Sequence, residues 1–206
     1  DGRQYRSDQA CERLDLLPAH ERCDVVDDPE RTMLGTEQEA WLDAGLVDDG
    51  VWDLIGQQTV LTDMSISIGG VTGINNDQWD GYAAARERLV ESASKTPRSL
   101  VLSGDIHAAM LNQVGPLDEP RLIELVAPSA TTRMDRTLAA GLGLALLAHR
   151  NVRVFEPAVH GYLLLDMSSS QITVTLRNVD PNDSESSVST VGRWLITPGS
   201  RVPVDA

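Results

Sequence analysis

The feature that most constrains the fold is an apolar run followed directly by polar side chains that could bind a ligand or take part in catalysis. Residues Arg98–Ser103 (RSLVLS) have the composition of a short buried strand, and Gly104, Asp105 and His107 follow at once. In α/β proteins, ligands collect at the carboxyl ends of such strands. The sequence therefore predicts an α/β fold with a site at this edge of its sheet.

The pair Asp105 and His107 offers a carboxylate oxygen and an imidazole nitrogen two residues apart. This combination suits iron, zinc or manganese, and a carboxylate alone also serves calcium. Gly104 is expected to allow the sharp turn that presents them. The spacing leaves an alternative open, in which Asp105 caps a turn and His107 bonds a backbone carbonyl.

The rest of the chain mixes helical and strand patterns, which also indicates the α/β class. Thr36 and Glu39 fit a capping box at the start of a helix with an apolar stripe of Trp41, Leu42 and Leu46. Further helices are predicted over 82–94 and 137–149. Strands are predicted over 51–61, 108–114, 122–127, 152–156, 161–167 and 171–179, and loops over 1–31 and 65–80.

Charge and hydropathy exclude two classes of protein. A formal net charge of −14 argues against nonspecific binding to nucleic acid. The longest apolar stretch, 138–148, is interrupted by two glycines and is shorter than the roughly 18 residues that a membrane span needs.

Cys11 and Cys23 flank a polar loop that contains a proline. The arrangement suits a short disulfide-closed loop in an oxidising compartment, and two reduced thiols are the alternative.

Seven segments, in order along the chain, resemble the alkaline phosphatase D (PhoD-like) metallophosphoesterases. They are DGRQYRSDQAC (1–11), MLGTEQEAWL (33–42), WDLIGQQ (52–58), NDQWDGY (76–82), LSGDIH (102–107), ELVAPS (124–129) and HGY (160–162). The resemblance covers residues 1–180 or so.

The resemblance implies a two-sheet α/β sandwich with flanking helices, of which 1–180 would be the C-terminal part and 181–206 a tail or edge strand. It implies metal-dependent hydrolysis of small phosphate monoesters and diesters by a metal-activated water, with iron and calcium as the metals. Asp105 and His107 fall on metal-site positions. A secreted, periplasmic or cell-surface bacterial enzyme is expected.

The family's earlier ligand motifs, including a Cys and a Gly-Asp followed by Tyr, are not found in these residues. We therefore expect an upstream segment or a partner chain to complete the active site. The alternative is a non-catalytic truncated or split module that acts as a binding or structural partner.

Three further candidates have competing interpretations. Arg3 and Arg6 are expected to bind phosphate oxygens, or else to hold their loop by bonding Asp8 or Asp1. His160 is a candidate proton donor to the leaving alkoxide, or a structural histidine beside a glycine turn. The loop 76–80 is expected to cover the cleft, with Trp79 as a packing anchor.

Overall fold

A five-stranded mixed sheet forms the centre of the molecule. The computed structural model describes residues 1–206 except 15–18, 133, 135–138, 141–142, 144–145 and 147–148. The sheet has the strand order β2-β5-β7-β6-β8. Its strands are β2 (Asp53–Gly56), β5 (Ser99–Ser103), β6 (Ala109–Val114), β7 (Leu122–Val126) and β8 (Val152–Glu156). β2, β5 and β7 run parallel, so their carboxyl ends meet at one edge.

The central strands β6 and β7 are buried along their whole length, and most of their residues are apolar. One face packs on a four-stranded antiparallel sheet of order β12-β11-β10-β9. This second sheet consists of β9 (Gly161–Met167), β10 (Ile172–Asn178), β11 (Ser189–Ile196) and β12 (Val204–Asp205). Leu100 and Leu125 from the first sheet meet Val174 and Trp194 from the second in one apolar cluster.

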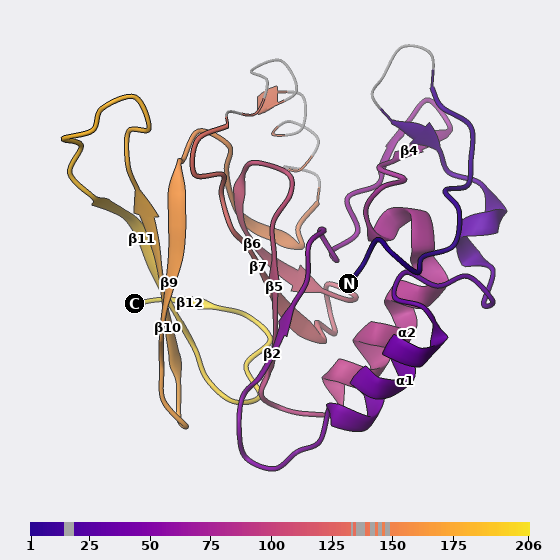
Figure 1. The fold of residues 1–206 in the computed structure, drawn as a ribbon, viewed down its shortest axis with the longest axis horizontal. Helices are drawn as coiled ribbons and strands as arrows, with labels where there is room; N and C mark the ends of the chain where they lie inside the picture. The colour runs from indigo at the N-terminus through magenta and orange to yellow at the C-terminus, as the bar shows by residue number, and fades with distance from the viewer. Residues whose placement is uncertain (15–18, 133, 135–138, 141–142, 144–145, 147–148) are drawn as a thin grey trace.

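Helices α1 (Thr36–Gly45) and α2 (Ala83–Ser94) cover the other face of the central sheet (Figure 1). α2 buries Leu89 and Ala93 against Val101 and Leu122 of the sheet, and Leu42 of α1 packs against the same cluster. The result is a layered arrangement of sheet, sheet and helices, as the α/β sandwich class requires. Within the described residues, no helix is long and apolar enough to cross a membrane.

A small third sheet corrects two loop predictions. β1 (His20–Glu21), β3 (Ile66–Ile68) and β4 (Val71–Ile74) lie within segments that we expected to be irregular. β3 and β4 form a hairpin in which Ile68 faces Val71. Gly69 and Gly70 make its two-residue turn with φ of 61° and 87°, a conformation that favours glycine and matches the twist of a hairpin.

The start of α1 also differs from the prediction. Its N-cap is Gly35 at φ 83°, so Thr36 lies inside the helix and the expected capping box is absent. Thr32 lies before the helix, where its hydroxyl accepts from the N–H of Gly35 and donates to Glu39. Trp41, placed on the apolar stripe by the sequence, is 74% exposed.

The structure also contains two 3-10 helices, and some elements are shorter than predicted. The 3-10 helices are η1 (Asp24–Asp27) and η2 (Trp79–Tyr82). The strand predicted over 51–61 is limited to β2, and residues 57–62 form a loop. The helix predicted over 137–149 falls largely outside the described residues.

A buried carboxylate ties this loop to the sheet. Glu124 on β7 is 0% exposed. Its oxygens accept from the N–H groups of Leu61 (2.6 Å) and Thr62 (2.9 Å), the hydroxyl of Ser103 (2.6 Å) and the amide of Asn112 (3.0 Å). Four donors around one carboxylate replace the water that burial removes.

Glu124→Gln should destabilise the protein, because the new amide group turns a donor toward donors and leaves at least one of them unpaired. We expect a loss of about 2–4 kcal/mol in the free energy of unfolding, measured by denaturant titration. The control Glu91→Gln removes an equal charge from an exposed position of α2 and should stay within about 0.5 kcal/mol of wild type. Equal stability of the two variants would contradict this role of Glu124.

Candidate active site

The turn after β5 has an unusual backbone. Asp105 and His107 have φ of 74° and 58°, the left-handed region that non-glycine residues seldom occupy. Gly104, which we expected to make the turn, does not have positive φ, and a Cβ there would lie 3.9 Å from the carbonyl oxygen of Gln58. Such backbone conformations cost free energy, so they persist only where the surrounding structure holds them, and they concentrate at functional sites.

Asp105 is gripped by side chains from two distant segments. Gln78 donates from Nε2 to Oδ2 at 2.6 Å, and Arg3 Nη2 lies 3.4 Å from Oδ1. No backbone N–H of the described chain bonds this carboxylate, so Asp105 does not cap a turn. His107 is exposed and makes no hydrogen bond to any described residue.

The guanidinium groups of Arg3 and Arg6 converge on Asp77, whereas the backbone N–H of Arg3 donates to Asp1 Oδ1 at 2.8 Å. Arg3 Nη1 lies 2.5 Å from Asp77 Oδ2, and Arg6 Nη2 lies 2.9 Å from Oδ1. Burial alone would raise the pKa of Asp77, but the hydrogen bonds from the two guanidinium groups outweigh it and lower the pKa. Arg3 therefore contacts the candidate metal ligand Asp105 directly, whereas Arg6 contacts Asp77.

His160 is buried, at 6% exposure. The backbone N–H of His160 donates to Asn178 Oδ1 (3.2 Å). Within the described structure the ring Nδ1 has no hydrogen-bond partner. The following Gly161 has φ 146°, and a Cβ there would overlap the carbonyl of Arg177. The Gly161 N–H bonds the carbonyl of Ser129, in the segment after β7, at 3.1 Å.

The loop 76–80 packs closely against the chain that carries the arginines. Trp79 is 1% exposed and donates from Nε1 to Gln57 Oε1 at 2.9 Å, which confirms it as a packing anchor. Asn76 donates to the carbonyl of Ala10. Gly81 fits because a Cβ would lie 2.6 Å from the carbonyl oxygen of Asn76.

The residues present supply two donors suited to a metal ion. Asp105 and His107 offer oxygen and nitrogen from one exposed turn. Among the described residues, no group of three His, Cys, Asp or Glu side chains is placed to hold a metal. The pair therefore fits a metal ion as two ligands of a larger set.

Sequence reasoning missed Gln78, Glu124 and Gln57. All three are amide or carboxylate side chains whose partners lie far away along the chain. Gln57 Nε2 donates to Ser103 Oγ at 2.8 Å and so supports the strand just before Asp105. The only available signal was that each lies within a segment of the family resemblance.

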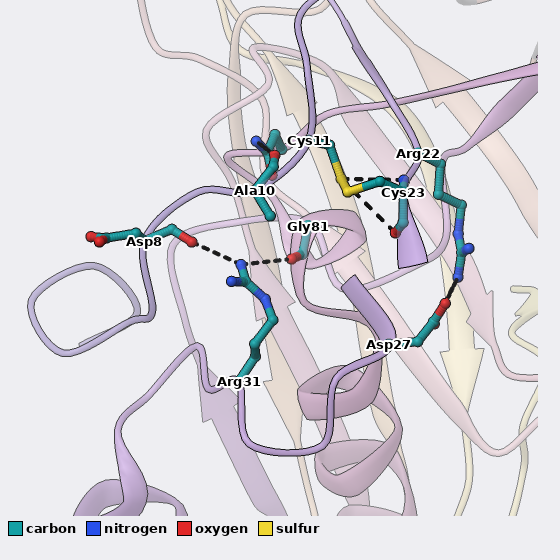
Figure 2. Close-up of a disulfide and its surroundings, with 9 residues drawn as sticks. Asp8, Ala10, Cys11, Arg22, Cys23, Asp27, Arg31 and Gly81 are labelled. Atoms are coloured by element: carbon teal, nitrogen blue, oxygen red, sulfur yellow. Dashed lines mark hydrogen bonds and ion pairs between the residues drawn. A yellow bond between two sulfur atoms is a disulfide. The ribbon is translucent and has the colours of Figure 1, made fainter. Parts of the chain in front are cut away.

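A disulfide closes the loop that follows the arginines (Figure 2). Cys11 and Cys23 are joined with an S–S distance of 2.08 Å. Figure 2 shows Arg31 beside this loop, where it donates to the carbonyl oxygens of Asp8 (2.8 Å) and Gly81 (3.4 Å). Arg31 thereby ties Asp8, three residues before the bridge, to the segment 76–82.

The bridge should be detectable in protein from its native compartment. We expect an intact mass about 2 Da below that of the reduced protein. Replacing both cysteines by serine should cost about 2–4 kcal/mol in the free energy of unfolding, because the open loop gains conformational freedom in the unfolded chain. Two free thiols by alkylation and mass analysis would contradict the bridge.

A second carboxylate of the loop 76–82 is buried near an arginine. Asp80 is 4% exposed, and its Oδ1 lies 2.6 Å from Arg86 Nη1. Burial raises the pKa of Asp80 to about 6, and the attraction of Arg86 only partly offsets it. Folded protein therefore binds this proton more tightly than the unfolded chain does.

The sign of the pH effect follows from that raised pKa. The raised pKa of Asp80 stabilises the folded protein fully at pH values below the pKa of this residue in the unfolded chain. This contribution to the free energy of unfolding is lost as pH rises through about 6. Relative to Asp80→Asn, wild type should gain on the order of 2–3 kcal/mol between pH 7 and pH 4. Denaturant titrations of both proteins at several pH values measure this difference, and a constant difference would refute it.

Three comparisons with known proteins agree. The family model described as PhoD-like phosphatase matches residues 1–176. Alkaline phosphatase D of Bacillus subtilis strain 168 is 35% identical over 112 residues, which make up 53% of this chain and 18% of that protein. A solved chain titled "Structure of PhoD" matches with a TM-score of 0.78 at 24% identity, over 96% of this chain and 39% of its own length. The last match concerns the fold and confirms the α/β sandwich.

Proposed function

Because this chain belongs to the PhoD-like phosphatase family, we propose that it carries part of the active site of a metal-dependent phosphatase. The substrates would be small phosphate monoesters and diesters. The observation that carries the proposal is the turn after β5, where Asp105 and His107 hold left-handed conformations at the carboxyl edge of the sheet. Arg3 beside Asp105 adds positive charge at the same place.

In this proposal Asp105 and His107 are metal ligands, with iron and calcium as the metals that the family resemblance implies. Bound metal ions supply Lewis acidity that polarises a phosphoryl oxygen and acidifies water. The remaining ligands would come from another part of the protein or from a partner chain. The match covers 39% of the length of the solved relative, so most of that relative lies outside the matched region.

Arg3 is the better placed of the two arginines to bind a phosphate oxygen. Its side chain is 38% exposed, and its guanidinium group lies between Asp77 and Asp105. The hydrogen bond to Asp77 raises its pKa, so it stays protonated. Arg6 is 18% exposed and acts through Asp77, which it holds in place for Arg3.

His160 takes the role of proton donor to the leaving alkoxide. The support is its buried ring, whose Nδ1 has no partner among the described residues. The bond from Gly161 to Ser129 places it on a segment that joins the carboxyl edge of the sheet. The disulfide supports a secreted, periplasmic or cell-surface location, where such bridges persist.

A non-catalytic module is the second candidate function. It is favoured by one observation, that the described residues bring only two suitable ligands together. The two functions differ in whether Asp105 and His107 matter for metal content and turnover in the full-length protein.

Asp105→Ala and His107→Ala should each remove metal and lower phosphatase activity by more than about 100-fold, since even the partners of metal ligands are worth about 10–100-fold. Elemental analysis gives the metal content, and hydrolysis of p-nitrophenyl phosphate and its bis ester gives the activity. Asp118→Ala, at an exposed loop position, is the matched control. Full metal content and turnover in both test variants would overturn the proposed site.

A further inference from the structure

We infer that Gln78 is a positioning residue that fixes the carboxylate of Asp105 for metal binding. This inference rests on the proposed function. Gln78 is 4% exposed and comes from the loop before η2, far along the chain from Asp105. It spans the space between the loop 57–62 and the turn after β5, with one end of its amide on each.

The orientation of the Gln78 amide is determined by its neighbours. Its Oε1 accepts from the N–H of Val60 at 2.5 Å, and a backbone N–H can only donate. Nε2 must therefore be the end that faces Asp105, where it donates to Oδ2 at 2.6 Å. A flipped amide would place two donors together at Val60 and two acceptors together at Asp105.

Glu124 holds both sides of this contact in place. It binds the N–H groups of Leu61 and Thr62, next to Val60, and so fixes the backbone that orients Gln78. It also binds the hydroxyl of Ser103, two residues before Asp105. A single buried side chain thus sets the spacing between the residue that donates and the residue that accepts.

The contact has a chemical consequence for the carboxylate. Asp105 is exposed and sits on a left-handed turn, so its carboxylate would rotate freely without a partner. The donor on Oδ2 selects one rotation and leaves lone pairs of both oxygens available. Arg3, at 3.4 Å from Oδ1, is the longer and more exposed contact. Partners of this kind orient metal ligands and contribute to metal affinity.

The test uses the full-length protein stripped of metal and titrated with Mn²⁺, with free Mn²⁺ followed by electron paramagnetic resonance. Gln78→Met keeps the side-chain volume and removes the donor. It should weaken the Asp105-dependent Mn²⁺ site about 10–100-fold. Activity on p-nitrophenyl phosphate should recover toward the wild-type kcat at saturating Mn²⁺, because Gln78 does not touch the substrate.

Gln113→Met is the matched control. Gln113 is equally buried, at 1% exposure, but faces Ile123 at the opposite edge of the sheet and bonds the carbonyl of Arg201. It should leave Mn²⁺ affinity unchanged. If Gln78→Met fails to fold, Gln78→Asn retains a buried amide that is too short to span Val60 and Asp105, and should also weaken Mn²⁺ binding.

Asp105→Ala separates the possible failures. Wild-type Mn²⁺ affinity in Gln78→Met, with the site lost in Asp105→Ala, would overturn the positioning role and leave the proposed function intact. Equal loss of Mn²⁺ affinity in Gln78→Met and Gln113→Met would also overturn it, because removal of any buried amide would then have the same effect. Unchanged Mn²⁺ binding in Asp105→Ala would overturn the metal assignment itself, and the role of Gln78 with it.

Discussion

The hydrogen bonds that Glu124 accepts are the interaction on which the carboxyl edge of the sheet depends. A carboxylate at 0% exposure is tolerated only when donors replace its hydration, and here two backbone amides, a hydroxyl and a side-chain amide do so. These donors belong to the loop after β2, the end of β5 and the neighbouring strand β6. One buried side chain therefore holds together the segments that surround the candidate site.

Two arginines at the site offset the charge of the neighbouring carboxylates. The protein carries a formal net charge of −14, yet Arg3 and Arg6 meet at Asp77 and Arg3 extends to Asp105. The ion pairs hold both arginines in place within an acidic chain. A small anion would meet a local positive group there, whereas a long polyanion would meet repulsion from the rest of the surface.

The sequence predicted those parts of the fold that local patterns encode. The buried strand before Asp105, the helix α2 and the meander of β9 and β10 follow from apolar spacing, and the ordered motifs identified the family. The start of α1 was misplaced because Gly35 is its N-cap and Glu39 bonds Thr32 and Arg88. The Gly69-Gly70 hairpin was missed although its signal was present. Gln78 and Glu124 were out of reach, because their function arises only from partners that folding brings together.

The strand order of the central sheet also bears on how the chain folds. β9, β10 and β11 pair with their sequence neighbours, whereas β2 and β5 pair although β3, β4 and α2 lie between them in the sequence. Loop-closure entropy favours the local pairings first, so the antiparallel meander is expected to form before the central sheet. Asp105, which needs β5, the loop after β2 and the segment before η2 at once, would then reach its final environment among the last steps of folding. The geometry of the candidate site is in this sense a readout of complete folding.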